Sequence, residues 1–383
     1  MSIEACFWVS GLALAYAYVG YPMVLALLGW LSPAPEIRRK DQTPTVTMII
    51  VACNEETQID DRLRSCHDLD YPKDRLEILV ASDGSTDQTD EIVLRHAARG
   101  VRLLRLPGPR GKAAAINAAV PEAQGELLVF CDVRQDLDPQ IIRALAADFA
   151  DPKVGAVSGE LHLGPSGAGL EGVGLYWRYE KWIRLAESRV DSTVGVTGAI
   201  YAMRRALHRP LDPRTILDDV ALPMLAAVAG YRVVFEPQAK AYDRLSGSAK
   251  TEYRRKVRTL AGNYQLLALY PSLLNPFRNR LFWQFASHKL LRLAAPWCLV
   301  GLLVTSAFLA AGGGLLFPAA FGLQLAFYLL ALAGWVAKRL GRRSRLLSVP
   351  YSFVLLNIAS AASLFGFLSG DEIAAWRSAR RRR

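Results

Sequence analysis

Short apolar runs alternate with helical stretches between Thr45 and about residue 245. The apolar runs are rich in β-branched residues and are four to eight residues long, as buried strands usually are. They occur at "TVTMIIVA", "RLEILVAS", "VRLLRL" and "ELLVFCD", with helical segments such as "GKAAAINAAVPEA" between them. This alternation predicts an α/β domain built on a mostly parallel sheet with helices on both faces.

Both ends of the chain carry much longer apolar segments. Residues 6–31 have no charge and exceed the roughly 20 residues that span a bilayer. Their length, and the acid in the preceding "MSIEA", argue against a cleaved signal peptide. Residues 293–311 and 315–336 predict a hairpin of two spans joined at "GGG". Residues 347–369 are interrupted by Pro350 and Asn357, so this segment either crosses or re-enters.

Aromatic and basic residues mix at helical spacing over residues 275–292, directly before the apolar hairpin. This pattern predicts an interfacial amphipathic helix. The chain therefore divides into five predicted parts: a membrane helix (1–35), a cytoplasmic α/β domain (36–270), an interfacial helix (271–293), membrane helices (294–370) and a basic tail (371–383).

Composition supports membrane integration. The 383 residues are 52% hydrophobic with a net charge of +11, and no basic stripe carries interleaved aromatics, so a nucleic-acid partner is not expected. Basic clusters at 36–40 and 338–345 place the domain in the cytoplasm and the N-terminus outside. Full crossing by residues 347–369 would put Arg380–Arg383 outside, against this rule. The five cysteines and five histidines show no metal-ligand spacing.

Polar clusters follow the predicted strands, where ligands bind in open α/β sheets. "VACNEE" and "ASDGSTDQT" end the first two strands, and "FCDVRQD" ends a later one with Asp132. "GPRGKAAAIN" puts Lys112 at a helix N-terminus, where charge and free N–H groups favour phosphate. Each cluster has a simpler interpretation, such as a turn with a helix cap or an exposed lysine.

Taken in order, these clusters resemble the inverting family-2 glycosyltransferases, whose nucleotide-sugar-binding fold is of the GT-A type. The resemblance spans roughly residues 45–265, and the apolar ends resemble those of cellulose, hyaluronan and poly-N-acetylglucosamine synthases. It implies that Asn54 and Glu55 lie near the nucleotide base, that Asp83 binds the uridine and that Lys112 binds the diphosphate. Asp132 would be the first acid of the Asp-x-Asp motif, with Mg²⁺ or Mn²⁺ as cofactor.

The same resemblance supplies acceptor and catalytic residues. "VTGAIYAMRR" would place Thr197 and Gly198 at the acceptor, and "ILDDVALPM" would place Asp218 there with Asp219 as the general base. "RRKVRTLAGN" stands where the family has Gln-x-x-Arg-Trp, so Arg255 and Arg258 would join the nucleotide-sugar site. The simpler interpretations are a helix N-terminal acid pair and a snorkelling cation.

Several positions depart from the family pattern. Arg134 replaces the second acid of the Asp-x-Asp motif, Thr259 replaces the tryptophan, Arg255 the glutamine and Leu217 the threonine. The strand period of two keeps residues 132 and 134 on one side, so Arg134 would point at the same diphosphate as Asp132. Alternatively, Arg134 pairs with Asp136 or Asp138.

The leading hypothesis is a membrane-bound inverting glycosyltransferase that adds a sugar from a UDP-sugar, UDP-N-acetylglucosamine or UDP-glucose, to a growing cell-surface polysaccharide. The alternatives are transfer of one sugar to a lipid such as a polyprenyl phosphate or a ceramide-like lipid, or a non-catalytic membrane partner subunit. Partners would be the donor, the acceptor and membrane lipids, with room for an oligomer or partner subunits.

Overall fold

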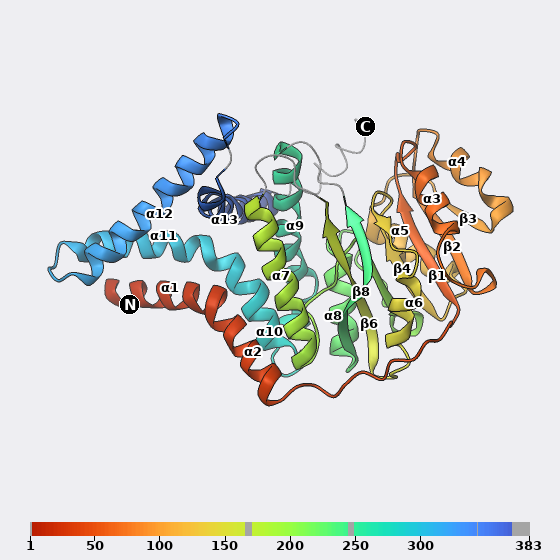
Figure 1. The fold of residues 1–383 in the computed structure, drawn as a ribbon, viewed down its shortest axis with the longest axis horizontal. Coiled ribbons are helices and arrows are strands. Elements are labelled where there is room, and N and C mark those ends of the chain that lie inside the picture. The colour runs from red at the N-terminus through yellow and green to blue at the C-terminus, as the bar shows by residue number, and fades with distance from the viewer. Residues whose placement is uncertain (1, 165–170, 244–248, 343, 370–383) are drawn as a thin grey trace.

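The computed structural model describes residues 2–164, 171–243, 249–342 and 344–369, so the predicted basic tail lies outside the described residues. A twisted sheet stands at one end of the molecule and long apolar helices at the other (Figure 1). The strands of this sheet are β1 (Val46–Ala52), β2 (Leu76–Asp83), β3 (Val101–Leu106), β4 (Leu127–Cys131), β5 (Asp136–Leu137), β6 (Val154–Leu163), β7 (Ile200–Arg204) and β8 (Arg232–Asp243).

The sheet has the strand order β3-β2-β1-β4-β7-β6-β8-β5. The first four strands in this order are parallel, and β6 and β8 are also parallel. β7 runs antiparallel to both β4 and β6, and β5 runs antiparallel to β8, so the sheet is mixed. Because β1, β2 and β4 are parallel neighbours, they deliver their carboxyl-terminal loops to one edge of the sheet.

Helices cover both faces of the sheet, as the sequence predicts. All seven residues of β1 are buried; Met48 and Ile50 pack into the core under one face, and Ile49 and Val51 into the core under the other. This is the strand period of two with both faces apolar. The covering helices are α3 (Ile59–His67), α4 (Thr89–Arg95) and α6 (Ile141–Asp148) on the Ile50 side, and α5 (Lys112–Glu122) and α8 (Asp218–Val228) on the Ile49 side.

Four helical segments within the described ranges are long and apolar enough to cross a membrane: Ile3–Leu31, Phe282–Ala310, Leu316–Arg339 and Leu346–Ser369. They expose large apolar side chains, among them Phe308 at 69% and Leu323 at 73%. Apolar surface of this extent is stable in lipid and unfavourable in water. The segments comprise α1 (Ile3–Ala15), η1 (Tyr16–Gly20), α2 (Tyr21–Leu31), α10 (Phe282–Phe285), η6 (Ala286–Leu290), α11 (Leu291–Ala310), α12 (Leu316–Arg339) and α13 (Arg345–Ser369).

A layer of helices separates the sheet from the apolar helices. α7 (Glu171–Val190) and α9 (Ala249–Leu269) stand upright in Figure 1, while α1 and α11 run across the view. α13 is seen nearly end-on and packs against α7, α9 and α12. In the region where the sequence predicts an interfacial helix, a short 3₁₀ turn at Pro271–Leu274 comes first, and helix begins only at Phe282 and continues into α11.

Candidate active site

The loops after β1 and β2 are tied together by hydrogen bonds. Asn54 has the left-handed φ of 56°, which asparagine tolerates better than most residues. Its side-chain oxygen accepts the Thr86 N–H at 2.8 Å, and its own N–H donates to Ser85 Oγ at 3.2 Å. The Glu55 N–H donates to Thr89 Oγ1 at 2.8 Å. The "VACNEE" and "ASDGSTDQT" clusters are therefore hydrogen-bonded neighbours.

Asp83 at the end of β2 is fully buried and fixes the loop in front of α5. Its carboxylate accepts the Arg110 N–H at 2.7 Å and the Gly111 N–H at 2.9 Å. The close contact between the loop after β2 and the loop before α5 requires glycine at position 84. Gly84 has a φ of +66°, and a Cβ there would lie 2.5 Å from the Gly108 carbonyl carbon. Asp83 thus sets the position of the α5 N-terminus, and its contact with a uridine stays a prediction.

Lys112 is the first residue of α5 and joins two acids from distant parts of the chain. Its Nζ lies 3.0 Å from Asp132 Oδ1 and 3.4 Å from Asp218 Oδ2. Burial alone would lower the pKa of Lys112, but the charges of Asp132, Asp218 and Asp219 outweigh it and raise that pKa. The structure therefore brings the predicted diphosphate lysine, the predicted metal ligand and the predicted acceptor acids into one charged cluster.

Asp132 follows β4 and stays ionised in this cluster. Burial would raise the pKa of its carboxyl, but Lys112, Arg134 and Arg258 together lower it. Arg258 lies on α9 one turn from Arg255, so α9 contributes positive charge to the side where a diphosphate is predicted. The nucleotide contacts of Arg255 and Arg258 stay predictions.

Asp219 is half-buried beside Asp218 at the N-terminus of α8. Burial and the Asp218 charge raise the pKa of Asp219 to about 6, against the opposing charges of Lys112, Lys289 and Arg184. A carboxyl with a pKa close to neutral is suited to accept a proton from a hydroxyl group.

The predicted acceptor segment lies directly against this carboxylate. A Cβ added at Gly198 would lie 3.0 Å from Asp219 Oδ2, and the Val196 N–H donates to the Asp219 carbonyl at 2.8 Å. Thr197 is buried and its N–H donates to Ser158 Oγ at 3.1 Å. The structure thus brings Thr197 and Gly198 together with Asp219, and their contact with an acceptor stays a prediction.

Several residues that position these acids were not found from the sequence. Tyr201 donates its hydroxyl to Asp218 at 3.2 Å and stacks on Phe130. Gln265 of α9 accepts the Ile216 N–H at 2.9 Å, just before the acid pair. Their partners are 17 and 49 residues away along the chain, so no local spacing could reveal them.

Arg134 has a different partner from those weighed in the sequence. Its guanidinium pairs with Asp243 at 2.5 Å, at the end of β8, and not with Asp136 or Asp138. β4 ends at Cys131, so the strand period does not extend to residues 132–134. Arg134 nevertheless helps to lower the pKa of Asp132, so its charge acts on the cluster.

The described residues contain no group of three or more His, Cys, Asp and Glu side chains arranged to hold a metal ion. Asp132 fits the role of a single ligand, since its side chain is 44% exposed. Mg²⁺ usually keeps several waters and takes one or two carboxylates plus substrate phosphate oxygens. One carboxylate therefore suits a cation that arrives with the nucleotide.

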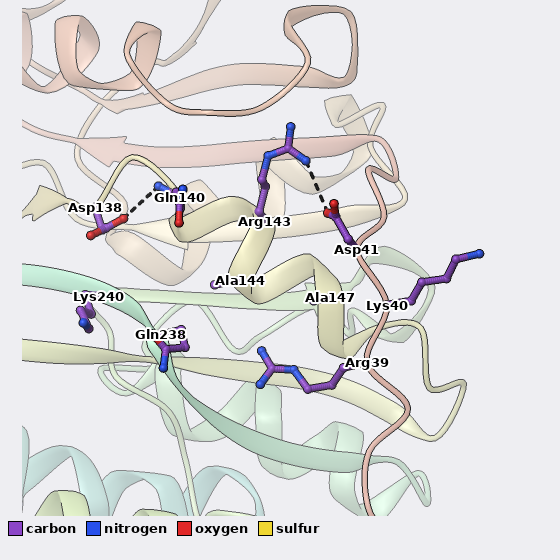
Figure 2. Close-up of a pocket in the computed structure, with 10 residues that line it drawn as sticks. All are labelled: Arg39, Lys40, Asp41, Asp138, Gln140, Arg143, Ala144, Ala147, Gln238 and Lys240. Atoms are coloured by element: carbon purple, nitrogen blue, oxygen red, sulfur yellow. Dashed lines mark hydrogen bonds and ion pairs between the residues drawn. The ribbon is translucent and has the colours of Figure 1, made fainter.

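A separate cavity of about 440 Å³ lies between α6, the segment after the first apolar helix, and β8, with Asp138 just before α6 also in its lining (Figure 2). Arg39 lines it and pairs with the buried acids Asp148 and Glu236 at 2.9 Å and 2.5 Å. None of the residues in the Lys112 cluster lines this cavity, so it is distinct from the candidate active site.

Comparison with known proteins identifies the class. Residues 47–210 match Glycosyl transferase family 2, and residues 132–362, more than half of the chain, match Glycosyl transferase family group 2. The chain belongs to glycosyl transferase family 2, and it is an enzyme of that class.

Individual relatives carry names that agree with this family assignment. A probable glycosyltransferase of Bacillus subtilis, YdaM, is 26% identical over 263 residues, covering 63% of this chain and 61% of the relative. The poly-β-1,6-N-acetyl-D-glucosamine synthase of Staphylococcus epidermidis is 23% identical over 233 residues, covering 59% and 56%. The chain thus spans less than two thirds of the length of these relatives.

Among solved structures, the mannosyltransferase PcManGT from Pyrobaculum calidifontis, in complex with GDP-mannose and Mn²⁺, aligns with a TM-score of 0.73. The two sequences are 23% identical, and the alignment covers 96% of this chain and 99% of that one. The predicted GT-A fold with added apolar helices is confirmed.

Proposed function

We propose that the protein is a membrane-integrated inverting glycosyltransferase that transfers a sugar from a UDP-sugar to a hydroxyl group of a cell-surface glycan. The observation that supports this best is the Lys112 cluster. It combines a lysine at a helix N-terminus, suited to a diphosphate, with an acid of raised pKa, suited to a hydroxyl.

In this reaction the acceptor oxygen forms a bond to C1 of the donor sugar. The bond between C1 and the diphosphate oxygen breaks, and its electron pair leaves with the nucleoside diphosphate. Asp219 takes the acceptor proton, and C1 inverts because attack and departure occur on opposite faces. Lys112 and Arg258 stabilise the charge that develops on the diphosphate. A divalent cation at Asp132, when bound, would add to that stabilisation.

The membrane arrangement supports transfer at the cytoplasmic face. The basic segments at 36–40 and 338–345 flank the catalytic domain and the end of α12, and basic flanks stay in the cytoplasm. UDP-N-acetylglucosamine and UDP-glucose are the proposed donors, and the S. epidermidis synthase is a relative whose name specifies an N-acetylglucosamine polymer.

The test is transfer by purified protein in lipid nanodiscs with radiolabelled UDP-N-acetylglucosamine, UDP-glucose and GDP-mannose, followed by sizing of the product. A labelled glycan from a UDP-sugar is expected, and no turnover of any donor would contradict the proposal and favour a non-catalytic partner subunit.

Asp219→Asn provides the site-specific prediction. Loss of a positioned general base should reduce transfer by about 10²-fold or more. Binding of UDP, measured by titration calorimetry, should stay near that of the wild type, because Asp219 lies on the acceptor side. Transfer above about a tenth of the wild-type rate would contradict the role of Asp219 as the base.

A further inference from the structure

The buried carboxylate of Glu187 lies on α7, between the apolar helices and the sheet (Figure 1). Its two oxygens face different parts of the molecule. Oε1 accepts the Tyr21 hydroxyl at 2.6 Å and bonds His288 Nδ1 at 2.7 Å, and both partners belong to apolar segments. Oε2 accepts the Val194 N–H at 3.1 Å and the Thr193 hydroxyl at 3.3 Å. One carboxylate therefore joins the membrane helices to the segment that follows α7.

The membrane side of this junction is held by further bonds. Tyr21 directly follows the π-helical turn η1, and His288 lies in the π-helical turn η6. Such turns are rare and often occur at functional sites. The two turns contact each other, since Tyr16 Oη lies 3.0 Å from Ser287 Oγ. The second ring nitrogen of His288 lies 2.6 Å from Glu180 Oε1. Both groups that bond Oε1 are therefore fixed in place by neighbouring turns and side chains.

The other side of the junction leads directly to the candidate general base. Val194 is two residues before Val196, whose N–H donates to the Asp219 carbonyl at 2.8 Å. Gly195 between them has a φ of +90°, and a Cβ there would lie 3.1 Å from the Val220 side chain. The segment is thus packed closely against the start of α8. A displacement at Val194 would be passed on to the predicted acceptor residues that follow it.

Resting on the proposed function, we propose that Glu187 is a positioning residue for the acceptor. It holds residues 193–198 against Asp219 and ties their position to the membrane helices. A carboxylate suits this role because both of its oxygens accept hydrogen bonds, whereas the amide of a glutamine has a single accepting oxygen. Glu187→Gln would therefore lose the donors on one of the two sides. Glu187 acts through residues 193–198 and not by contact with a substrate.

Tyr21→Phe tests this role with a smaller change. The variant loses one hydroxyl that donates to Glu187, and its ring can keep the edge contact with Trp283. Tyr16→Phe is the matched control from the same apolar segment. The Tyr16 hydroxyl bonds Ser287 and Trp283 at this junction. The two tyrosine variants thus each remove one hydroxyl, and only Tyr21→Phe removes a bond to Glu187.

The first measurement is hydrogen–deuterium exchange of the full-length protein in nanodiscs, which needs no substrate. Amides of residues 193–198 should exchange about tenfold faster in Glu187→Gln, the effect of losing one or two hydrogen bonds, and faster to a smaller degree in Tyr21→Phe. Tyr16→Phe should exchange at the wild-type rate. Unchanged exchange in both Glu187→Gln and Tyr21→Phe would overturn the proposal, as would equally fast exchange in Tyr16→Phe.

The second measurement separates positioning from loss of folded protein. With radiolabelled UDP-N-acetylglucosamine as donor and octyl N-acetylglucosaminide as acceptor, KM for the acceptor should rise by about tenfold in Glu187→Gln and by less in Tyr21→Phe. The Kd for UDP and the number of UDP sites per protein, from titration calorimetry, should stay near the wild-type values, because Lys112 and Asp132 lie on other elements. A purely structural role would instead reduce the number of UDP sites and leave the acceptor KM unchanged, and this result would contradict the proposal.

Tyr21→Phe keeps the test decisive if Glu187→Gln does not fold. A wild type that turns over no donor would count against the proposed function. The exchange measurement would still decide whether Glu187 fixes residues 193–198, so the two failures can be told apart.

Discussion

At the residue scale, Lys112 acts on the protonation of both acids that the proposed reaction uses, Asp132 and Asp219. The same lysine that faces the predicted diphosphate also counteracts the rise in the pKa of Asp219. In the proposed reaction, donor binding and proton transfer would share the charge of Lys112, so we expect a change at Lys112 to appear in both.

The pH dependence of transfer follows from this coupling. Asp219 acts as a base only when ionised, so kcat/KM should rise with pH through about 6, the raised pKa of Asp219, and then level off. Lys112→Met removes a charge that lowers this pKa, so the rising limb should move to higher pH, along with weaker donor binding.

Arg110→Met is the matched control, because it removes an exposed cation from the same loop. The rising limb of the pH profile of Arg110→Met should stay at the wild-type position. The measurement is kcat/KM for a neutral acceptor from pH 5 to 9, and an unshifted limb in Lys112→Met would show that the lysine does not control Asp219.

Metal dependence tests the roles of Asp132 and Arg134. The wild type should lose transfer in EDTA and regain it with Mg²⁺ or Mn²⁺, because Asp132 supplies a carboxylate for a cation shared with the diphosphate. Arg134→Asp restores a second acid and should increase the affinity for the cation.

The control for this variant is Arg134→Ala, which breaks the pair with Asp243 without adding an acid. Activity is titrated against Mg²⁺ for all three proteins. Full wild-type activity in EDTA would mean that protein cations alone stabilise the leaving diphosphate.

The sequence predicted residues whose role depends on their local position. Lys112 and Asp132 sit at a helix start and a strand end, which sequence patterns locate well, and the structure places them 3.0 Å apart. The Arg134–Asp243 pair could not be predicted, because its two residues are 109 positions apart. His288 was included in a predicted interfacial helix, and only the fold brings it to Glu187, 2.7 Å away.

At the element scale, α9 holds the segment that leads into α8. Gly262 of α9 packs so closely that an added Cβ would lie 2.8 Å from Leu217 Cγ and 3.1 Å from Ile216. The amide of Gln265 binds the same segment twice: its oxygen accepts the Ile216 N–H, and its nitrogen donates to the Arg214 carbonyl. The acid pair at the start of α8 is therefore positioned by α9.

Gly262→Ala should displace this segment and lower kcat by about tenfold, since small misplacement of a catalytic group is costly. UDP binding should change less than kcat, because Lys112 and Asp132 lie on other elements and Arg258 is one turn before Gly262 on α9. Gly174→Ala on α7 is the control, because a Cβ there meets nothing within 4 Å. Equal kcat values for the two variants would show that α9 does not position the acids.

Sequence patterns predicted the buried parallel strands. They also predicted a helix over residues 271–293, whereas this helix begins only at residue 282, and the reason is physical. Asn275 and Asn279 satisfy nearby backbone groups with their side chains: Asn275 accepts the Phe277 N–H, and Asn279 donates to the Leu273 carbonyl and accepts the Leu281 N–H. Such local bonds compete with helix formation. The antiparallel course of β7 likewise depends on its long-range pairing with β4.

At the scale of the whole molecule, the direction of α13 bears on the topology that the sequence left open. α1 and α11 lie side by side along one axis with opposite chain directions, whereas α13 is nearly end-on in the same view (Figure 1). If α1 and α11 cross the bilayer, α13 lies close to the plane of its surface. Its contacts with α7 and α9 place it in the layer between the catalytic domain and the membrane helices.

We therefore expect α13 to be interfacial and not to cross, although its length and composition would allow crossing. Three crossings then leave residues after α13 in the cytoplasm, which brings Arg380–Arg383 into agreement with the positive-inside rule. The measurement is labelling of Ser369→Cys, an exposed position at the end of α13, by an impermeant maleimide in right-side-out and inside-out vesicles.

Two reference positions define the sides of the membrane. Gly312→Cys lies in the turn between α11 and α12, and Arg342→Cys lies in the basic loop before α13. Ser369→Cys should react together with Arg342→Cys in inside-out vesicles, because a surface helix leaves both ends on one side. Labelling of the wild-type protein gives the background signal from the five native cysteines. Reaction of Ser369→Cys on the same side as Gly312→Cys would show that α13 crosses, with the basic tail outside despite its charge.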